Sequence, residues 1–588
     1  MALAFLAAGC ATPGTTTTAV TYVAVRGGSI TLGIAQSPTG CNPNTPLGDT
    51  PATNLILSAV LPSPYLVSPT GAAAPTQPDP NLIVQSELVS TKPETIVYTL
   101  NPHAVWSDGT PITAKDFIYA WQQQRLPQSF DQQPTVASVA GYRDIASVTG
   151  TNRGRTVTVI FHTPFADWQM LFANLLPAHV MEKVGWDPTC ATVDPAIDLS
   201  GGPFKIARAT SSEVDLVSNP KWWGTPPDIR RLNVRIASGP DQLAQWMQSG
   251  AIQVAAPSAV TPAYLTEMTS LPGAQSTVNL SSTILQLEMA AGPDSPLPPD
   301  TRFAIALSID RQALVTQQAD WALPSIEVAN SHIYVQGQTG YKLPPGASNP
   351  PSATTTTSPS TSSTLIGQGG SVNFPTTPQL AQAAQLMVAS GFARDPSTPW
   401  REAFGPSFTL HLVVDDGDPW AAAAAPQVVS QLEAAGYAVT LYSVPSEANA
   451  GSVLANGYAD LALVPRTSTP YLSQSLAWYS TLLGPPGQNG SQDWSGYSNT
   501  DFNQLITAAS EQLMPSTAAT DYANADTKLW DDMVALPLFA EPSTLVWSRS
   551  VGGIVPDPKG NSLLWYAQNW AMRVPESTAN TTPQLPNQ

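Results

Sequence analysis

The segment Tyr98–Gln124, YTLNPHAVWSDGTPITAKDFIYAWQQQ, constrains the fold most, because it predicts a strand, a turn and a helix in one short run. Thr113 and Asp116 have the spacing of a capping box, in which each side chain accepts a hydrogen bond from the other residue's exposed backbone amide. Phe117 and Trp121 share one face of the predicted helix and are expected in the core. The segment is therefore a rigid platform, and it offers no pair of nucleophile and base.

Helical and strand patterns alternate along much of the remaining chain, which predicts an α/β protein. Strands are expected within 29–36, 199–218, 230–237, 408–416, 438–444 and 535–548. Helices are expected within 240–256 (followed by a strand), 301–318 (one or two helices, with Asp310 as a candidate N-cap), 376–392, 424–437, 500–513 and 522–534. Apolar residues between Phe165 and Leu176 also recur at helical spacing, which predicts a helix there.

Residues 343–378 are rich in Pro, Thr and Ser, with SATTTTSPSTSST at their centre. Such a composition cannot bury enough apolar area to fold, so we expect a mobile loop.

Composition and motifs exclude several classes of function. A net charge of −18 argues against a nucleic-acid partner, because binding to phosphates requires a basic surface. No G-x-S-x-G, H-E-x-x-H or P-loop motif is present, and the 5 histidines are not spaced like metal ligands on one helix. We therefore expect a protein that is not an enzyme and that needs no cofactor and no metal.

Three acidic residues, Asp415, Asp416 and Asp418, follow the strand expected within 408–416. Carboxylates at this spacing attract calcium, but the segment lacks the length and the closing Glu of an EF-hand loop. We interpret it as a turn.

The N-terminal stretch MALAFLAAGCAT is a short apolar run of small residues that ends at Cys10. It resembles a bacterial lipobox, which implies that Cys10 is lipidated; the alternatives are an ordinary signal cleavage site or a chance cysteine. No Lys or Arg precedes Cys10, although a secretory signal has a basic start. We therefore expect that translation begins upstream or that the chain was trimmed, and that residues 1–28 are a truncated signal and a tether.

The two remaining cysteines, Cys41 and Cys190, lie far apart in the sequence. An export route permits a disulfide between them, but the sequence alone does not show that they are close in space.

Five segments carry a resemblance to a known family: 105–121 (VWSDGTPITAKDFIYAW), 201–208 (GGPFKIAR), 217–223 (VSNPKWW), 302–315 (RFAIALSIDRQALV) and 494–509 (WSGYSNTDFNQLITAA). Each is similar to a signature of the extracytoplasmic solute-binding proteins of family 5, which include dipeptide- and oligopeptide-binding proteins. They occur in the family's order within roughly residues 29–575. A narrower resemblance, to a mycobacterial lipoprotein of this family, lies in 40–66 and 171–180.

The resemblance implies an α/β, bilobed clamp of the periplasmic-binding-protein type (class II with an extra subdomain), in which the chain crosses between the lobes twice. Lobe 1 is expected to comprise 29–62, 200–283 and 536–575, with 63–199 as its extra subdomain. Lobe 2 is expected at 284–535, and 576–588 form a tail. A ligand is expected to be buried between the lobes.

The resemblance also points to residues that contact the ligand. Tyr119 matches a tyrosine that the family places at the cleft, or it faces solvent. Asp49 lies in a loop that faces the cleft in the family, or it serves the turn alone. Where peptide-binding members have a Trp-x-x-Asp segment for the peptide's amino group, this chain has Arg466 and no Asp between Asp460 and Asp493.

A guanidinium suits a phosphate or a carboxylate, so a contact between Arg466 and the ligand would favour an anionic or sugar-rich ligand; the alternative is a surface arginine. Tyr471, Trp478 and Trp494 are further candidate ligand contacts in lobe 2, and each of them could instead be a core residue.

Two functions follow from the resemblance. The first is a lipid-anchored receptor on the outer face of the plasma membrane that delivers a peptide or another small polar solute to an ABC permease. The second is a regulatory lipoprotein that binds a mannosylated phosphatidylinositol intermediate in envelope assembly, without transport. A monomer is expected in either case.

Overall fold

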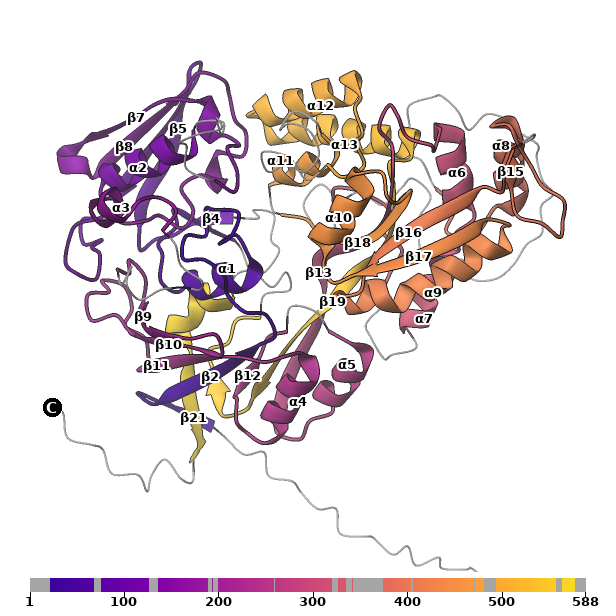
Figure 1. Cartoon of the computed structure of the whole chain (residues 1–588). Helices are drawn as coiled ribbons and strands as arrows, with labels where there is room; N and C mark the ends of the chain where they lie inside the picture. The colour runs from indigo at the N-terminus through magenta and orange to yellow at the C-terminus, as the bar shows by residue number, and fades with distance from the viewer. Residues whose placement is uncertain are drawn as a thin grey trace, which may run out of the picture.

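The computed structural model of the chain describes residues 22–67, 76–125, 136–188, 193, 199–257, 260–319, 326–334, 341, 374–402, 405–469, 471–480, 493–556 and 563–576. These residues form two parts that lie side by side (Figure 1). We use lobe 1 for 29–62, 200–283 and 536–575, extra subdomain for 63–199, and lobe 2 for 284–535. Most of the segment predicted to be a mobile loop, up to residue 373, lies outside the described residues.

One sheet of ten strands joins the two lobes, in the order β17-β16-β18-β13-β19-β12-β2-β11-β10-β9. Its strands are β2 (Ser29–Ile34), β9 (Phe204–Ala209), β10 (Glu213–Ser218), β11 (Arg231–Ile236), β12 (Val254–Ala255), β13 (Ala274–Met289), β16 (Thr409–Asp415), β17 (Ala438–Val444), β18 (Leu461–Thr467) and β19 (Ala535–Ser548). Because β13 and β19 are long and pair antiparallel, the chain crosses between the lobes twice, as the clamp architecture predicts.

The crossing strands change register at two points, one of them between Leu285 and Gln286. At the other, Leu280 pairs with Pro542 and Ile284 pairs with Ala540, so an irregularity interrupts the ladder. Such irregularities bend a strand and re-aim its side chains. Glu541 lies at this point, between the two lobes.

The extra subdomain is built on a four-stranded antiparallel sheet in the order β5-β6-β8-β7. Its elements are β5 (Ile83–Thr91), β6 (Glu94–Leu100), β7 (Ile145–Thr151), β8 (Thr156–Phe161), α2 (Ala114–Gln124) and α3 (Ala178–Val184). The predicted capping box at the start of α2 is confirmed: Asp116 accepts a hydrogen bond from the Thr113 amide at 2.8 Å, and the Thr113 hydroxyl caps the helix. Phe117 and Trp121 are buried, as predicted.

The helix predicted over Phe165–Leu176 is not present. The structure has only the short 3-10 turn Trp168–Met170 there, and Phe172 and Asn174 adopt left-handed backbone conformations with φ of 63° and 50°. Five of the apolar side chains, those of Phe165, Leu171, Phe172, Leu175 and Leu176, are nevertheless buried, because a loop can direct the same residues into a core, while Trp168 is half-buried. The spacing of the apolar residues therefore predicted the wrong secondary structure, although it correctly indicated that most of these residues face a core.

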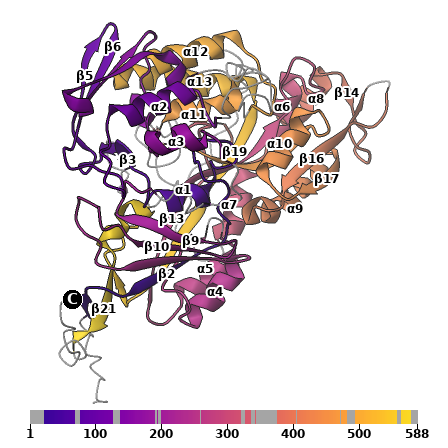
Figure 2. The same cartoon turned by 60° about the vertical axis from the view of Figure 1, so that its left-hand side comes forward.

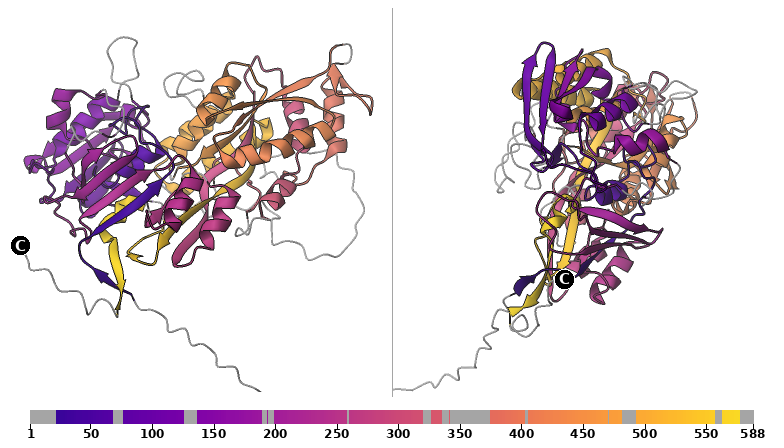
Figure 3. Two further views of the ribbon diagram at one scale, coloured as in Figure 1. Left: turned by 60° about the horizontal axis from the view of Figure 1, so that its bottom comes forward. Right: turned by 90° about the vertical axis from the view of Figure 1, so that its left-hand side faces the viewer.

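Helices cover the sheet in both lobes (Figures 2 and 3). Lobe 1 carries α1 (Pro51–Leu57), α4 (Pro240–Gln248) and α5 (Pro262–Thr269). Lobe 2 carries α6 (Pro299–Leu307), α7 (Arg311–Ala319), α8 (Leu380–Ala389), α9 (Pro419–Ala434), α10 (Glu447–Ala455), α11 (Leu472–Ser475), α12 (Thr500–Glu511) and α13 (Pro515–Asp532). Asp310 caps α7 as predicted, accepting a hydrogen bond from the Ala313 amide at 2.8 Å.

The remaining strands form small sheets: β1 (Tyr22–Val25), β20 (Val551–Gly552) and β21 (Ala571–Pro575) in one, β3 (Tyr65–Val67) with β4 (Thr76–Pro78), and β14 (Phe392–Ala393) with β15 (Arg401–Glu402). One apolar core fills lobe 1 and the extra subdomain. A second fills lobe 2 and includes residues of α4 and α5, so these two helices pack at the junction with lobe 2. α11, α12 and α13 stand beside the extra subdomain (Figure 1).

Candidate binding site between the lobes

Direct hydrogen bonds join the extra subdomain to lobe 2. The carboxylate of Asp167 accepts hydrogen bonds from the Ser473 hydroxyl at 2.5 Å and from the Ser473 amide at 3.2 Å. The Ala166 amide donates to the Ser510 carbonyl at 2.6 Å. A cavity of about 130 Å³ lies beside these contacts, and its lining includes Gly141, Asp144 and Phe165 of the subdomain and Ser473, Ile506 and Ser510 of lobe 2. The two parts are thus in contact, as in a closed clamp.

Arg466, at the end of β18, is the centre of a buried ion-pair network. Its Nε lies 2.5 Å from a carboxylate oxygen of Glu288 on β13, and both side chains are only 1% exposed. Its Nη1 lies 3.3 Å from Glu447 at the start of α10. Burial alone would lower the pKa of Arg466, but the two carboxylates raise it above its usual value, so the guanidinium stays charged.

Aromatic side chains enclose this guanidinium. It lies 3.8 Å from the ring centre of Trp494 and 5.6 Å from that of Trp478, which are distances of cation–π contact. Gly451 in α10 permits this arrangement, because a Cβ at that position would lie 1.9 Å from the Trp494 ring. Of the six predicted ligand contacts, the structure brings these three together: Arg466, Trp478 and Trp494.

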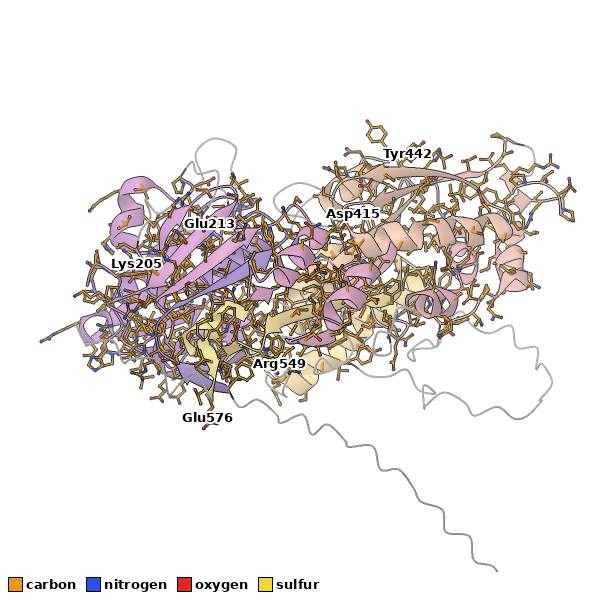
Figure 4. All side chains as sticks on the ribbon, turned by 90° about the horizontal axis from the view of Figure 1, so that it is seen from below. Lys205, Glu213, Asp415, Tyr442, Arg549 and Glu576 are labelled. Carbon is orange, nitrogen blue, oxygen red and sulfur yellow. The ribbon has the colours of Figure 1, made fainter. Side chains whose placement is uncertain are left out.

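Further carboxyl groups lie at the end of β16 and in the turn that follows it. Asp415 ends β16 and accepts a hydrogen bond from the Gly417 amide at 2.9 Å. Asp418 caps α9 through the amides of Trp420 and Ala421. The predicted turn at 415–418 is confirmed by these contacts. In α/β proteins this edge of a sheet is where ligands bind, and Figure 4 places Asp415 on the side of lobe 2 that faces lobe 1.

The pKa values at this edge are raised. Burial raises the pKa of Glu447 to about 7, against the lowering effect of Arg466. Burial also raises the pKa of Asp418 to about 6 and that of Asp493 to about 7. Glu541, on the crossing strand β19, is only 6% exposed, and burial holds its pKa well above the usual range. Burial therefore favours the neutral form of these carboxyls more than water does.

The other three predicted contacts lie elsewhere. Asp49 is exposed and accepts a hydrogen bond from Asn54 at 2.8 Å, which is the turn role considered from the sequence. Tyr119 is buried against Trp186 in the core of the extra subdomain, so it does not line an open cleft in this conformation. Tyr471 lies at the contact between the lobes, where its hydroxyl interacts with Thr76.

Arg466 does not present an unpaired guanidinium to an anion. Two carboxylates already engage it, so the sequence-based argument for an anionic ligand loses its main support. Sequence reasoning missed Glu288 and Glu541, whose signal was a lone carboxylate inside an apolar strand, as in TILQLEMA and LPLFAEPS. It also missed Asp167, which lies in the wrongly predicted helix.

Cys41 forms a disulfide, and its Sγ lies 3.8 Å from the Pro188 carbonyl. Cys190 and Cys10 lie outside the described residues, so the pairing of Cys41 with Cys190 and the lipidation of Cys10 stay predictions. Across the described ranges, no helix has the length and apolar character to cross a membrane.

Comparison with known proteins places these features in a family. Residues 77–488 match the model of bacterial extracellular solute-binding proteins, family 5. The probable monoacyl phosphatidylinositol tetramannoside-binding protein LpqW of Mycobacterium tuberculosis is 26% identical over 430 residues, 71% of this chain and 64% of LpqW. The oligopeptide-binding protein OppA of Mycobacterium bovis is 30% identical over 324 residues, 54% of this chain and 53% of OppA.

The chain therefore spans less than two thirds of either relative. Among solved structures, the periplasmic EDTA-binding protein EppA superimposes with a TM-score of 0.80 at 23% identity, covering 96% of this chain and 99% of EppA, which shows the same fold. The relatives are binding proteins rather than enzymes. Together with the two strand crossings and the contact between the lobes, the family match shows that the chain belongs to the extracellular solute-binding proteins of family 5.

Proposed function

We propose that this protein is a lipid-anchored extracytoplasmic receptor that binds a polar solute between its two lobes by clamp closure and delivers it to an ABC permease. The observation that carries the proposal is the contact of Asp167 and Ala166 with lobe 2, in a molecule in which the long strands β13 and β19 run from one lobe to the other. Contacts of this kind can form and break as the strands bend, because hinge closure needs few residues to change conformation.

The proposed mechanism is a shift of population. A solute that touches both lobes binds the closed form more tightly than the open form and so increases the population of the closed form. The permease would recognise this closed form. The half-buried Trp494 offers an apolar face in lobe 2, while the partly exposed carboxyl of Glu447 offers an acceptor. Anchoring would occur through a diacylglyceryl group on Cys10. The tether would end before Tyr22, earlier than the boundary at residue 28 expected from the sequence, because residues 22–25 form β1 and pair with β21.

The test is native mass spectrometry of the protein purified from its own host, with small-angle scattering of the same sample. We expect a co-purifying solute, and a radius of gyration that increases when the solute is removed by partial unfolding and refolding. A protein that carries no solute and whose dimensions do not respond to any compound in a broad panel of peptides, amines, sugars and lipids would contradict the proposal. Hydrolysis of a Cys10-linked lipid and its loss in Cys10→Ser would test the anchor.

A second candidate function is supported by the similarity to LpqW, whose name describes a probable monoacyl phosphatidylinositol tetramannoside-binding protein. By that analogy the solute would be a mannosylated phosphoinositide, and no permease would be required. The carboxyl groups around Arg466 weigh against it, because they repel a phosphate. Lipid extraction of the purified protein separates the two candidates: a phosphorylated glycolipid favours the second, and a water-soluble solute favours the first.

A further inference from the structure

Charge is divided unevenly between the two lobes. Lobe 2 carries 21 Asp and Glu against 7 Lys and Arg, whereas lobe 1 carries 8 Asp and Glu against 9 Lys and Arg. Lobe 2 therefore supplies most of the net charge of −18, and lobe 1 supplies none of it. A molecule with this distribution turns lobe 1 toward a negatively charged surface and lobe 2 away from it.

Four basic residues of lobe 1 lie on the outer side of strands β9, β10 and β11. Lys205 is in register with Val217, and Val217 with Arg231, so two cations flank one valine in a row across three strands. Arg208 and Arg235 lie further along the same side, which Figure 4 shows from below. The other side of these strands is packed into the core, through Phe204, Ile206, Val214, Leu216, Leu232 and Val234.

The acidic residues of this outer side are held close to the sheet. Asp215 accepts a hydrogen bond from the Asn233 side chain at 3.2 Å and lies 3.6 Å from Arg231, and its side chain is only 11% exposed. Glu213 accepts a hydrogen bond from the same Asn233 side chain. In contrast, the Arg231 side chain is 53% exposed, and Arg208 is exposed as well. The surface that these strands present to solvent is therefore basic.

The N-terminal part of the described chain joins lobe 1 next to this surface. β1 begins at Tyr22 and pairs with β21, which lies at the lower end of lobe 1 in Figure 1. The link from β1 into β2 carries Arg26, which is 93% exposed and lies 3.3 Å from Asp228. Arg230 is adjacent, because its amide donates a hydrogen bond to the Gly28 carbonyl at 3.0 Å. We use basic face for Arg26, Lys205, Arg208, Arg230, Arg231 and Arg235.

The proposed lipid anchor would act on the same end of the molecule. The stretch from Cys10 to Tyr22 spans at most about 40 Å when it is fully extended. A bilayer that holds a lipid on Cys10 is therefore within about 40 Å of Tyr22, on the side of lobe 1 where the basic face lies.

Resting on the lipid anchor of the proposed function, we infer that the basic face is a docking surface for the headgroups of an anionic bilayer. A guanidinium pairs with a phosphate through two parallel hydrogen bonds, and five of the six cations are arginines. Each basic side chain near an anionic membrane strengthens binding by about fivefold. The cations are spread over a broad sheet surface and do not converge on one point, which favours a bilayer over a single acidic peptide.

The test uses the full chain with Cys10→Ser, so that binding comes from the protein surface and not from an attached lipid. Flotation measures its partition onto vesicles of phosphatidylcholine alone and of phosphatidylcholine with phosphatidylglycerol, at low and at physiological ionic strength. We expect the partition onto the anionic vesicles to exceed that onto the neutral vesicles by about tenfold or more, and to fall as salt is added.

Variants identify the surface that binds. Arg208→Glu combined with Arg230→Glu should lower the partition onto anionic vesicles by about tenfold or more. Lys115→Glu combined with Arg401→Glu is the matched control, because both residues are exposed outside lobe 1 and the change in net charge is the same. The control should keep its partition within about twofold of the parent protein. Circular dichroism checks that both variants fold.

The outcomes separate the inference from the proposed function. Equal binding to neutral and anionic vesicles, no binding to either at low ionic strength, or an equal loss in the control variant would overturn the inference. Binding of soluble poly-glutamate without binding of vesicles would also overturn it and would assign the basic face to an acidic protein segment. The solute and the Cys10-linked lipid are measured separately: the absence of both overturns the proposed function, while vesicle binding still decides the role of the basic face.

Discussion

The Nε of Arg466 and a carboxylate oxygen of Glu288 lie 2.5 Å apart, although the two residues are 178 positions apart in the chain and both are 1% exposed. The pair links β18 to β13 and so fixes the parallel strands of lobe 2 to a strand that crosses between the lobes. Its role is in the first place structural, because a guanidinium held by two carboxylates has little left to offer a ligand.

Removing one partner of this pair should lower the free energy of unfolding. Arg466→Met leaves Glu288 as a buried, uncompensated charge, so we expect a loss of about 3–5 kcal/mol in the free energy of unfolding, measured by urea titration. The double variant Arg466→Met with Glu288→Leu should recover a large part of the loss, because the ion-pair partner of Arg466 that it leaves, Glu447, is 41% exposed and accessible to water. A single variant as stable as its control, the exposed Arg401→Met, would contradict the buried pair.

Glu94 should make stability depend on pH. It is 1% exposed, its Oε2 accepts a hydrogen bond from the Phe165 amide at 2.6 Å, and its Oε1 has no partner among the described residues. Burial raises its pKa from 4.5 to about 7, while the Phe165 amide lowers it and Asp144 raises it. The folded state therefore holds the proton more tightly than the unfolded state.

A raised folded pKa contributes stability that is fully present below the unfolded pKa of about 4.5 and is lost as the pH rises through 7. Relative to Glu94→Gln, the wild-type protein should lose up to about 3 kcal/mol between pH 5 and pH 8. Urea titrations of both proteins at four pH values give the difference directly. A difference that stays flat, as expected for the exposed control Glu87→Gln, would refute the raised pKa.

The sequence predicted those features whose causes are local. The capping box of Thr113 and Asp116 and the N-cap Asp310 depend on residues three positions apart, and both were correct. The alternation of β16, α9 and β17 was also predicted, because periodicity is a property of the segment itself. The fold class was predicted from the five sequence signatures, which occur in the same order as in the family.

The candidate site was harder to predict, because its partners meet only in the folded chain. Nothing near Arg466 in the sequence shows that Glu288 and Glu447 neutralise it, so its charge was interpreted as available to a ligand. The loop at Phe172 and Asn174 was interpreted as a helix, because buried side chains recur at similar spacing in loops and in helices. Asp167, within that loop, was missed for the same reason.

The hydrogen bonds of Asp167 with Ser473 should favour the closed clamp. Ser473→Ala removes the donor at 2.5 Å and leaves the weaker amide contact, which should shift the equilibrium toward the open form by about 2- to 10-fold. Single-molecule energy transfer between labels in the two lobes measures this shift in the absence of solute. Ser516→Ala, exposed on α13, is the control, and equal populations in the two variants would show that the contact has no such role.

The disulfide of Cys41 should join it to Cys190. The chain has 3 cysteines, and Asn42 already donates a hydrogen bond to the Trp186 carbonyl at 2.7 Å, so the two loops are adjacent. Peptide mapping without reduction should recover one linked peptide containing Cys41 and Cys190, and Cys190→Ser should cost about 2–4 kcal/mol of stability. A linked peptide that contains Cys10 instead would contradict both this pairing and the lipidation of Cys10.

Gly451 should be intolerant of alanine, although it lies inside the helix α10. In an ordinary helix Gly→Ala stabilises by about 0.5–1 kcal/mol. Here the new Cβ would lie 1.9 Å from the Trp494 ring, whose centre is 3.8 Å from the Arg466 guanidinium. Because neither the backbone of α10 nor the buried ion pair can yield easily, we expect Gly451→Ala to destabilise by about 1–3 kcal/mol.

A double-mutant cycle identifies the cause of that effect. Once Trp494→Ala has removed the ring, adding Gly451→Ala should be neutral or stabilising, because only the helix propensity remains. Urea titration of the four proteins gives the coupling free energy between the two positions. A Gly451→Ala penalty that persists without the Trp494 ring would mean that α10 does not pack on Trp494 in this way, and that the aromatic enclosure of Arg466 is built differently.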